Sequence, residues 1–337
     1  MFGKSKVLIA AFALAISSFA ATTAYAQTGY FNTYTDYVSL SKTGYNTAMQ
    51  GMCVDRNNNV IYAAKINNST HKTQLFSIKM NGTKSKRTVT LLKNSSTNST
   101  SYDLGHANDL AVKASAGDKH VSIYVAPMSD GSKYVNKIVK LSVDTAKKTY
   151  KVDKTYVLNY KGSNLSISGI TYSVGADKFI VRSGKKFFIG KFNDKTGKFD
   201  YEATFKLNYS KAVVKNTTMD VSNYIQQGIS FYQGTLYVPL TKPDAKGNAS
   251  NVSIILTYPL NIDSLIKEQK TRPTADFSKE LFTRKDLSFR ITSGAYKLFE
   301  IESVDFDSGT LYFNTNRGNT GTQNDMIATF NGYNYYK

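Results

Sequence analysis

The stretch that decides the fold is QGISFYQGTLYVPL, residues 227–240. Two runs of alternating apolar and polar residues flank a glycine turn, which is typical of a β-hairpin. The same pattern begins again at Gln50, Asn108, Ser168 and Glu302, so successive copies start 58, 60, 59 and 75 residues apart. This nearly constant period predicts a radial array of repeated units rather than separate domains.

Each repeat has room for four antiparallel strands. In the first repeat these are the hairpin at residues 50–65 and the alternating runs at 74–79 and 87–92. The last repeat has room for only three, and residues 30–41 alternate as a half-buried strand does. We therefore predict an all-β fold, a five-bladed β-propeller of four-stranded blades. Its ring is closed by residues 30–41 pairing beside residues 326–331, which leaves no long sheet edge open.

The one long interval reflects an insertion at residues 261–299. Within it, residues 264–270 have the composition of a short helix and residues 287–292 that of a strand. An insertion of this size either shapes a binding surface on one face of the array or covers the edge of a blade.

The N-terminus has the pattern of a secretory signal peptide. Lysines precede an apolar run at residues 7–16, and the small-x-small sequence AYA follows at residues 24–26. We expect residues 1–26 to be removed and residues 27–337 to form a single propeller domain, secreted and either released or held at the cell surface. No later stretch has the roughly 20 apolar residues that a spanning helix needs.

The charge balance is strongly basic. The chain has 43 Lys and Arg against 24 Asp and Glu, a net charge of +19, and loss of the two signal-peptide lysines leaves +17. Such a charge favours anionic partners. For an exported protein we expect anionic cell-envelope polymers or glycans and no nucleic acid. The basic residues form only short clusters, however, and a solvated surface explains them equally well.

A single cysteine, Cys53, excludes an internal disulfide, and its place in an alternating run favours a packed strand residue over a reactive thiol. Residues 55–59 (DRNNN) resemble half of a calcium loop but lack its glycine and glutamate, so a hairpin turn is the better interpretation. We expect a monomer without a metal or cofactor, stabilised by packing of 24 Tyr and 19 Phe.

The first strand of each propeller blade lines the central channel, so the first residues of the repeats should converge there. All five are polar, and ionisable residues lie beside them. We therefore predict an axial binding pocket of eight residues: Gln50, His106, Asn108, Asp109, Ser168, Gln227, Glu300 and Glu302. Alternatively, these side chains bond neighbouring backbone and trapped water to hold the blades together.

Glu300 and Glu302 are two residues apart on one predicted strand, so they face the same side and raise each other's pKa. A carboxylate pair across a pocket is what a glycosidase needs. Five-bladed glycosidases place an aspartate early in the first blade, where this chain has Gln50. No G-x-S-x-G motif occurs, and the three histidines have no evident nucleophile. The axial residues therefore form no complete catalytic set, and we assign no catalytic residue.

At these residues the chain resembles the helveticin family of large secreted antibacterial proteins of lactic-acid bacteria. The resemblance rests on residues 300–304 (EIESV), His106-Ala107 and Ile225-Gln226, short motifs spread over most of the mature chain. It implies a heat-labile bacteriocin with no settled catalytic residues, although some members lack a signal peptide of this kind. We expect a non-enzymatic bacteriocin that binds the envelope of related bacteria and inhibits them. The alternatives are an extracellular glycan-active enzyme and a surface adhesin.

Overall fold

The computed structural model describes residues 29–40, 48–67, 69–81, 87–128, 133–134, 136–319 and 322–335. The predicted signal peptide lies outside these residues. Within them, strands form all the regular structure except one helix, α1 (Ile262–Thr271). None of the described helical segments is long and apolar enough to cross a membrane.

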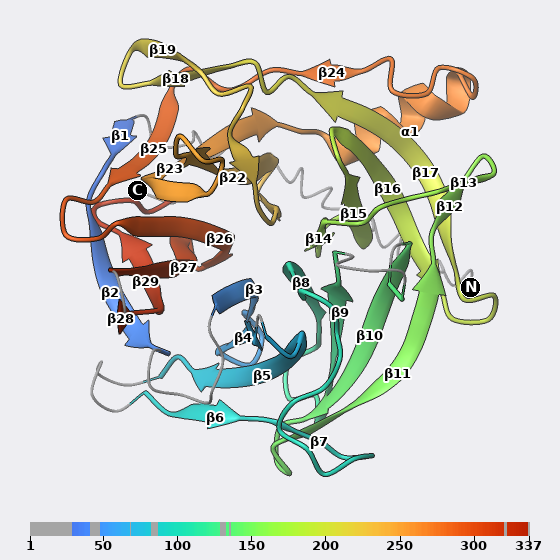
Figure 1. Cartoon of the computed structure of the whole chain (residues 1–337). Coiled ribbons are helices and arrows are strands. Elements are labelled where there is room, and N and C mark those ends of the chain that lie inside the picture. The colour runs from blue at the N-terminus through green and yellow to red at the C-terminus, as the bar shows by residue number, and fades with distance from the viewer. Residues whose placement is uncertain are drawn as a thin grey trace, which may run out of the picture.

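Five hairpins open five repeated units, as the sequence predicts, and their sheets radiate around a centre as in a β-propeller (Figure 1). We number the units 1 to 5 in chain order. Their hairpins are β3 (Ala48–Asp55) with β4 (Val60–Asn67), β8 (Asp109–Lys113) with β9 (His120–Ala126), β14 (Gly169–Ser173) with β15 (Lys178–Ser183), β21 (Ser230–Tyr232) with β22 (Thr235–Pro243), and β26 (Leu298–Asp307) with β27 (Thr310–Asn319). The two-residue strand β20 (Ile225–Gln226) also pairs with β22.

Outer strands complete each unit. They are β5 (Lys72–Lys79) and β6 (Val89–Leu91) in unit 1, β10 (Lys137–Asp144) and β11 (Thr149–Val157) in unit 2, β16 (Lys186–Asn193) and β17 (Lys198–Leu207) in unit 3, β23 (Ala249–Pro259) and β25 (Leu287–Thr292) in unit 4, and β29 (Met326–Phe330) in unit 5. A single parallel pair, Val157 with Lys198, joins β11 to β17 and so links units 2 and 3 in one sheet.

The N-terminal segment is divided between two sheets rather than forming the one strand expected. β2 (Tyr34–Ser39) pairs antiparallel with β29, which confirms the predicted pairing at the end of unit 5. β1 (Gly29–Phe31) instead pairs parallel with β25 of unit 4. Arg317 fixes β2 further, because its guanidinium donates to both carboxylate oxygens of Asp36 at 2.8 and 2.9 Å.

Short extra strands cover several outer edges. β7 (Lys93–Asn94) lies parallel to β11, β24 (Glu280–Leu281) lies parallel to β17, and β1 covers β25. Covered edges cannot template the pairing of another chain. The 261–299 insertion supplies β24, and its strand β25 completes unit 4, so this segment covers one unit and builds another.

Five apolar clusters lie between neighbouring units, and one of them joins unit 5 to unit 1. Aromatic rings dominate several of these interfaces: between units 4 and 5, the rings of Tyr232 and Phe306 stack at 4.5 Å with an angle of 4°. Cys53 is buried between units 1 and 2, as predicted, and burial raises the pKa of its thiol. The fold is therefore held together by contacts between sheets.

Candidate functional site

The eight predicted axial residues lie where the inner strands begin. Six of them are buried, and His106 and Ser168 are half-buried. The hydrogen bonds below bring residues of all five units together at this end of the inner strands. Whether they form a binding pocket remains a prediction.

Asp109 connects the units most extensively. Its Oδ2 accepts hydrogen bonds from the backbone N–H groups of Ile170 in unit 3, at 2.9 Å, and of Ile229 in unit 4, at 2.8 Å. Its Oδ1 accepts from the Ser303 hydroxyl in unit 5, at 2.8 Å. Burial raises the pKa of Asp109 to about 7, although these donors and Arg182 act in the opposite direction. This one carboxyl group is therefore best explained as a structural link between units.

Small residues let the inner strands approach this carboxyl group. A Cβ atom on Gly228 would lie 2.7 Å from both Asp109 Oδ1 and Ser303 Oγ. A Cβ atom on Gly51 would lie 2.7 Å from the backbone oxygen of Ala107, which accepts a hydrogen bond from the Gly51 N–H group. At Gly51 the backbone of β3 therefore lies closer to the backbone of Ala107 than a residue with a side chain would allow.

The two glutamates form the second part of the cluster. The charge of Glu300 acts on Glu302, and Gln227 Nε2 donates to Glu300 Oε1 at 2.6 Å. The register of β26 on β27 shifts between Ile301 and Ser303, so Glu302 occupies a β-bulge. The bulge lets Glu302 face the axis while the apolar residues on either side of it pack between units 4 and 5.

Burial raises the pKa of both glutamates, and the neighbouring Glu300 raises that of Glu302 further, well above its ordinary value. The folded chain therefore retains a proton that the unfolded chain releases above about pH 4. The stability that this proton contributes is complete below that pH and is lost as pH rises through the raised pKa.

We expect Glu302→Gln to be more stable than the parent protein at about pH 8, by about 1.4 kcal/mol for each unit by which the pKa is raised. The introduced amide would keep a donor for Glu300 without a titrating proton, so the two proteins should converge near pH 4. Urea unfolding followed by circular dichroism across this range measures the difference. Glu268→Gln, the same change at a half-buried glutamate of α1, is the control. If the free energy of unfolding had the same pH dependence in the parent protein and in Glu302→Gln, the folded chain would not retain a proton on Glu302.

The remaining predicted residues make local links. Asn108 Nδ2 donates to the backbone oxygen of Ser168 at 2.7 Å, and Arg182 donates to Ser168 Oγ and to that same backbone oxygen, both at 3.1 Å. Gln50 lies in a bulge of β3, where its backbone oxygen accepts from Asn314 Nδ2. The alternative role of holding the units together thus accounts for Asn108 as well as Asp109.

A buried ion pair beside the glutamates was not predicted. Lys65 Nζ lies 2.9 Å from Asp325 Oδ2, with both side chains fully buried, and donates to the backbone oxygen of Leu40 at 3.0 Å. The Asp325 charge also contributes to the raised pKa of Glu302. Lys65 in β4 thereby ties unit 1 to the N-terminal segment and to unit 5.

The large concave surface lies at the opposite ends of the inner strands, where the hairpins turn. This depression has a volume of about 1880 Å³, and none of the eight predicted residues lines it. Its lining comes from the turns that follow β3, β8, β14, β21 and β26, together with the first turns of α1. Phe231, Tyr172 and Phe192 present partly exposed rings to it. The 261–299 insertion therefore also shapes this surface.

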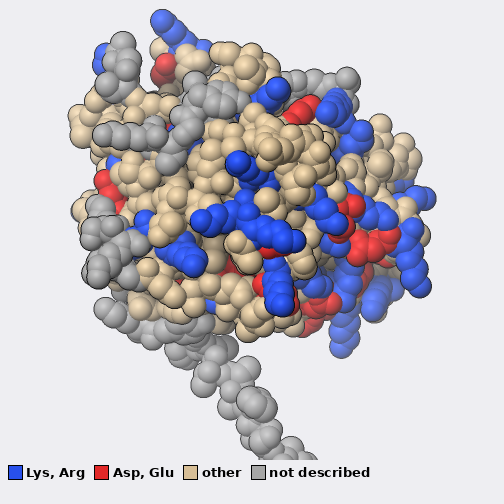
Figure 2. Space-filling view, turned by 90° about the horizontal axis from the view of Figure 1, so that it is seen from below, with Lys and Arg blue, Asp and Glu red and all other residues tan. Residues whose placement is uncertain are grey.

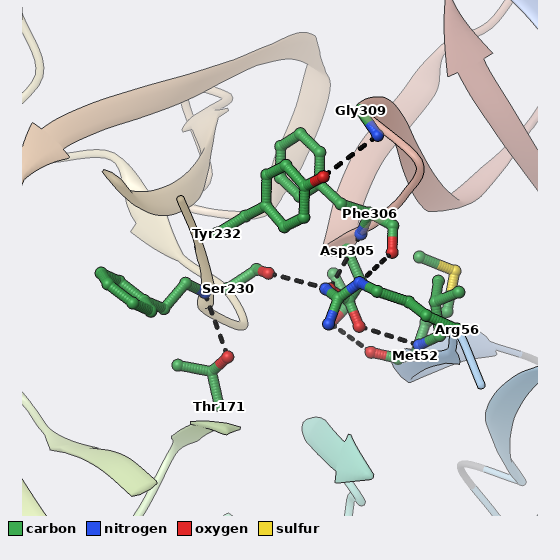
Figure 3. Close-up of polar contacts among 11 residues, drawn as sticks. Met52, Arg56, Thr171, Ser230, Tyr232, Asp305, Phe306 and Gly309 are labelled. Atoms are coloured by element: carbon green, nitrogen blue, oxygen red, sulfur yellow. Dashed lines mark hydrogen bonds and ion pairs between the residues drawn. The ribbon is translucent and has the colours of Figure 1, made fainter. Parts of the chain in front are cut away.

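Figure 3 shows polar contacts around Arg56, one of the residues that line the depression. Arg56 donates to Asp305 Oδ1 and to the backbone oxygen of Phe306, both at 2.7 Å, and lies 5.2 Å from the ring centre of Tyr232. Ser230 Oγ donates to the same Asp305 oxygen at 3.1 Å. Groups from units 1, 4 and 5 thus fix one Arg–Asp pair in place before any ligand binds.

Sequence reasoning missed the depression because it considered only the starts of the inner strands. Four of the five turns contain a glycine, but a glycine indicates only a turn, so the repeat gives no sign of a binding site there. The predicted hairpin turn at residues 55–59 is a weak signal, since it forms one wall of the depression. The structure confirms this turn, because Asp55 accepts hydrogen bonds from the N–H groups of Asn57 and Asn58 at 3.2 Å.

No protein-family model and no curated protein matches the chain. Among solved structures, it is similar to the C-terminal WD40 domain of Sif2, with 9% identity over 90% of this chain and 100% of that one, at a TM-score of 0.39. It is also similar to a GH43 β-1,3-galactosidase, with 10% identity over 90% of this chain and 94% of that one, at a TM-score of 0.46. A third similar structure is an exo-β-1,3-galactanase from Phanerochaete chrysosporium, with 10% identity over 90% of this chain and 63% of that one, at a TM-score of 0.45.

Proposed function

We propose that the protein is a secreted, non-enzymatic, helveticin-like bacteriocin that binds glycans of the envelope of related bacteria and inhibits those bacteria. In this proposal the five units are the blades of a five-bladed propeller, β2 closes the ring, and the depression is the binding site. The observation that carries the proposal is the depression itself, which combines exposed aromatic rings with fixed charged groups.

The depression suits a polymer of sugars. Sugar rings present apolar C–H faces and hydroxyl edges, which match a lining that contains both aromatic faces such as Phe231 and hydrogen-bonding groups such as Arg56. Its volume of about 1880 Å³ exceeds the roughly 300–1,000 Å³ of small-molecule sites. Several linked sugars would therefore fit, and the preformed Arg–Asp pair would limit the ordering cost of binding.

We expect the double variant Phe231→Ala/Tyr172→Ala to bind isolated walls of related bacteria about tenfold or more weakly, because it removes two aromatic anchors. Phe282→Ala is the matched control, since Phe282 is 62% exposed and does not line the depression. Wall pull-down and growth inhibition are both measured. Unchanged wall binding in the double variant would refute the depression as the binding site. If the parent protein binds walls without inhibiting growth, it is an adhesin.

A glycan-active enzyme is the second candidate, favoured by the raised pKa of Glu302, which a general acid requires. Against it, Glu302 is only 3% exposed, and neither Glu300 nor Glu302 lines the depression that a glycan could enter. Incubation with a glycan panel separates the two functions. Turnover that is lost in Glu302→Gln would establish the enzyme.

A further inference from the structure

We propose that units 2 and 3 carry a second binding surface, a lysine flank of Lys151, Lys154, Lys195 and Lys198. This flank would hold a linear polymer of repeating negative charge and lead it into the depression. The inference rests on the proposed function, because it names the ligand class and the path by which the ligand reaches that site.

The positive charge of the chain is concentrated in these units. Residues 133–198 contain 15 Lys and Arg against 4 Asp, a net charge of +11 out of +19 for the whole chain. Figure 2 shows blue side chains over the centre and right of one face, with red side chains among them on the right, the side on which Figure 1 places β10 and β11. A surface of one sign attracts and orients an oppositely charged polymer.

A β-bulge aligns the first two lysines. The register between β10 and β11 shifts at Lys140/Leu141, so Tyr150 packs between units 1 and 2 whereas Tyr156 packs between units 2 and 3. Lys151, next to Tyr150, and Lys154, two residues before Tyr156, consequently both face unit 3. Lys154 confirms this direction, because its Nζ donates to the backbone oxygen of Asp194 in unit 3.

The other two lysines continue the surface across the junction between units. Lys198 is the partner of Val157 in the parallel pair that joins β17 to β11, and Lys195 lies in the turn just before it. At about 3.3 Å per residue, the stretch from Lys151 to Val157 spans about 20 Å. Among the residues that the structure describes, no carboxylate forms an ion pair with any of these four lysines.

The flank runs into the depression through Asp194, which lines it. The acids along this path have lysine partners. Lys140 Nζ lies 3.3 Å from Asp194 Oδ2 and 3.2 Å from Asp153 Oδ2, and Lys113 and Lys191 lie 2.7 and 2.6 Å from the oxygens of Asp177. These ion pairs weaken the repulsion between the carboxylates and an anionic chain. A polymer with a charge on each repeat, such as a polyphosphodiester or a polyuronate, matches a flank of spaced lysines better than a single small anion does.

The test compares Lys151→Gln/Lys154→Gln/Lys195→Gln/Lys198→Gln with a control of equal charge, Lys72→Gln/Lys79→Gln/Lys246→Gln/Lys285→Gln. The control lysines are exposed and lie outside both surfaces. Labelled poly(glycerol phosphate), polygalacturonate and duplex DNA are titrated at about 50 mM and about 1 M salt. We expect the flank variant to bind one or both polymers about tenfold or more weakly at low salt, with a smaller salt dependence, and the control to resemble the parent protein.

Equal losses in both variants would overturn the inference, because net charge alone would then explain binding. Tighter binding of duplex DNA than of either polymer would also overturn it. A neutral glycan separates this inference from the proposed function. If the Phe231→Ala/Tyr172→Ala variant loses neutral-glycan binding while the flank variant keeps full polyanion affinity, the proposed function stands and the flank does not. If instead the flank variant loses polyanion binding while the Phe231→Ala/Tyr172→Ala variant keeps neutral-glycan binding, the flank stands and the depression is not the glycan site.

Discussion

Replacing Asp109 with alanine is expected to lower the free energy of unfolding by about 2 to 6 kcal/mol, because two buried N–H groups lose their acceptor at about 1–3 kcal/mol each. These are the amides of Ile170 and Ile229, which belong to different units. The total stability of a domain is about 5–15 kcal/mol, so the variant is expected to be the least stable single substitution at the axis. Urea unfolding followed by circular dichroism measures the change, since the chain has no tryptophan.

Two further variants make the Asp109 experiment specific. Ser303→Ala removes one donor from the same carboxyl group and should cost only about 1 kcal/mol. Asp109→Asn mimics the protonated carboxyl, because its amide can donate to Ser303 while its oxygen accepts from the two amides. Its cost should therefore be smaller than that of Asp109→Ala. Equal stability of Asp109→Ala and the parent protein would show that this carboxyl group does not hold the units together.

The second large effect is expected at the buried ion pair. Lys65→Met should lower the free energy of unfolding by about 3–5 kcal/mol, because it leaves the Asp325 carboxylate buried without its ammonium partner. Burial already raises the pKa of Asp325, and loss of Lys65 would raise it further. The folded variant would then take up a proton at low pH, so its deficit should be smaller at about pH 5 than at about pH 8.

The double variant Lys65→Met/Asp325→Leu is the control for this pair. Replacing both charges by apolar groups removes the uncompensated carboxylate, so much of the stability should return. A double variant that is no more stable than Lys65→Met would contradict the argument. Such a result would assign the loss to contacts of Lys65 other than the ion pair, such as its hydrogen bond to Leu40.

The sequence predicts the units well because their cause is local. Alternation at period two, glycine turns and near-equal spacing specify each hairpin, and the short last unit explains why β2 pairs with β29. The division of the N-terminal segment into β1 and β2 could not be predicted, since β1 pairs with β25, more than 250 residues away in the chain. Such a pairing depends on the assembled units rather than on neighbouring residues.

The axial residues are predicted as a set, but their contacts are not. The repeat places Asp109 and Glu302 at the axis, whereas the bulge at Glu302 and the amides that surround Asp109 depend on the other units. The depression has only a weak sequence signal, because the glycines that recur in its turns indicate a turn rather than a binding site. The lysine flank does have a sequence signal, which is the positive charge of residues 133–198. The alignment of its lysines on one face depends on the β-bulge between β10 and β11, which the spacing of the lysines in the sequence does not reveal.

The pairing of β2 with β29 has a consequence for biosynthesis. Asp36 of β2 and Arg317 of β27, the strand that pairs with β29, are 281 residues apart in the chain. At about 5–20 residues per second, a ribosome needs roughly 15 to 60 s to make the segment between them. During that time β2 has no partner, because β29 follows β27 in the chain, so the nascent chain exposes an incomplete apolar surface. Folding is therefore expected to finish only after translation, and to require a chaperone or an unfolded route until then.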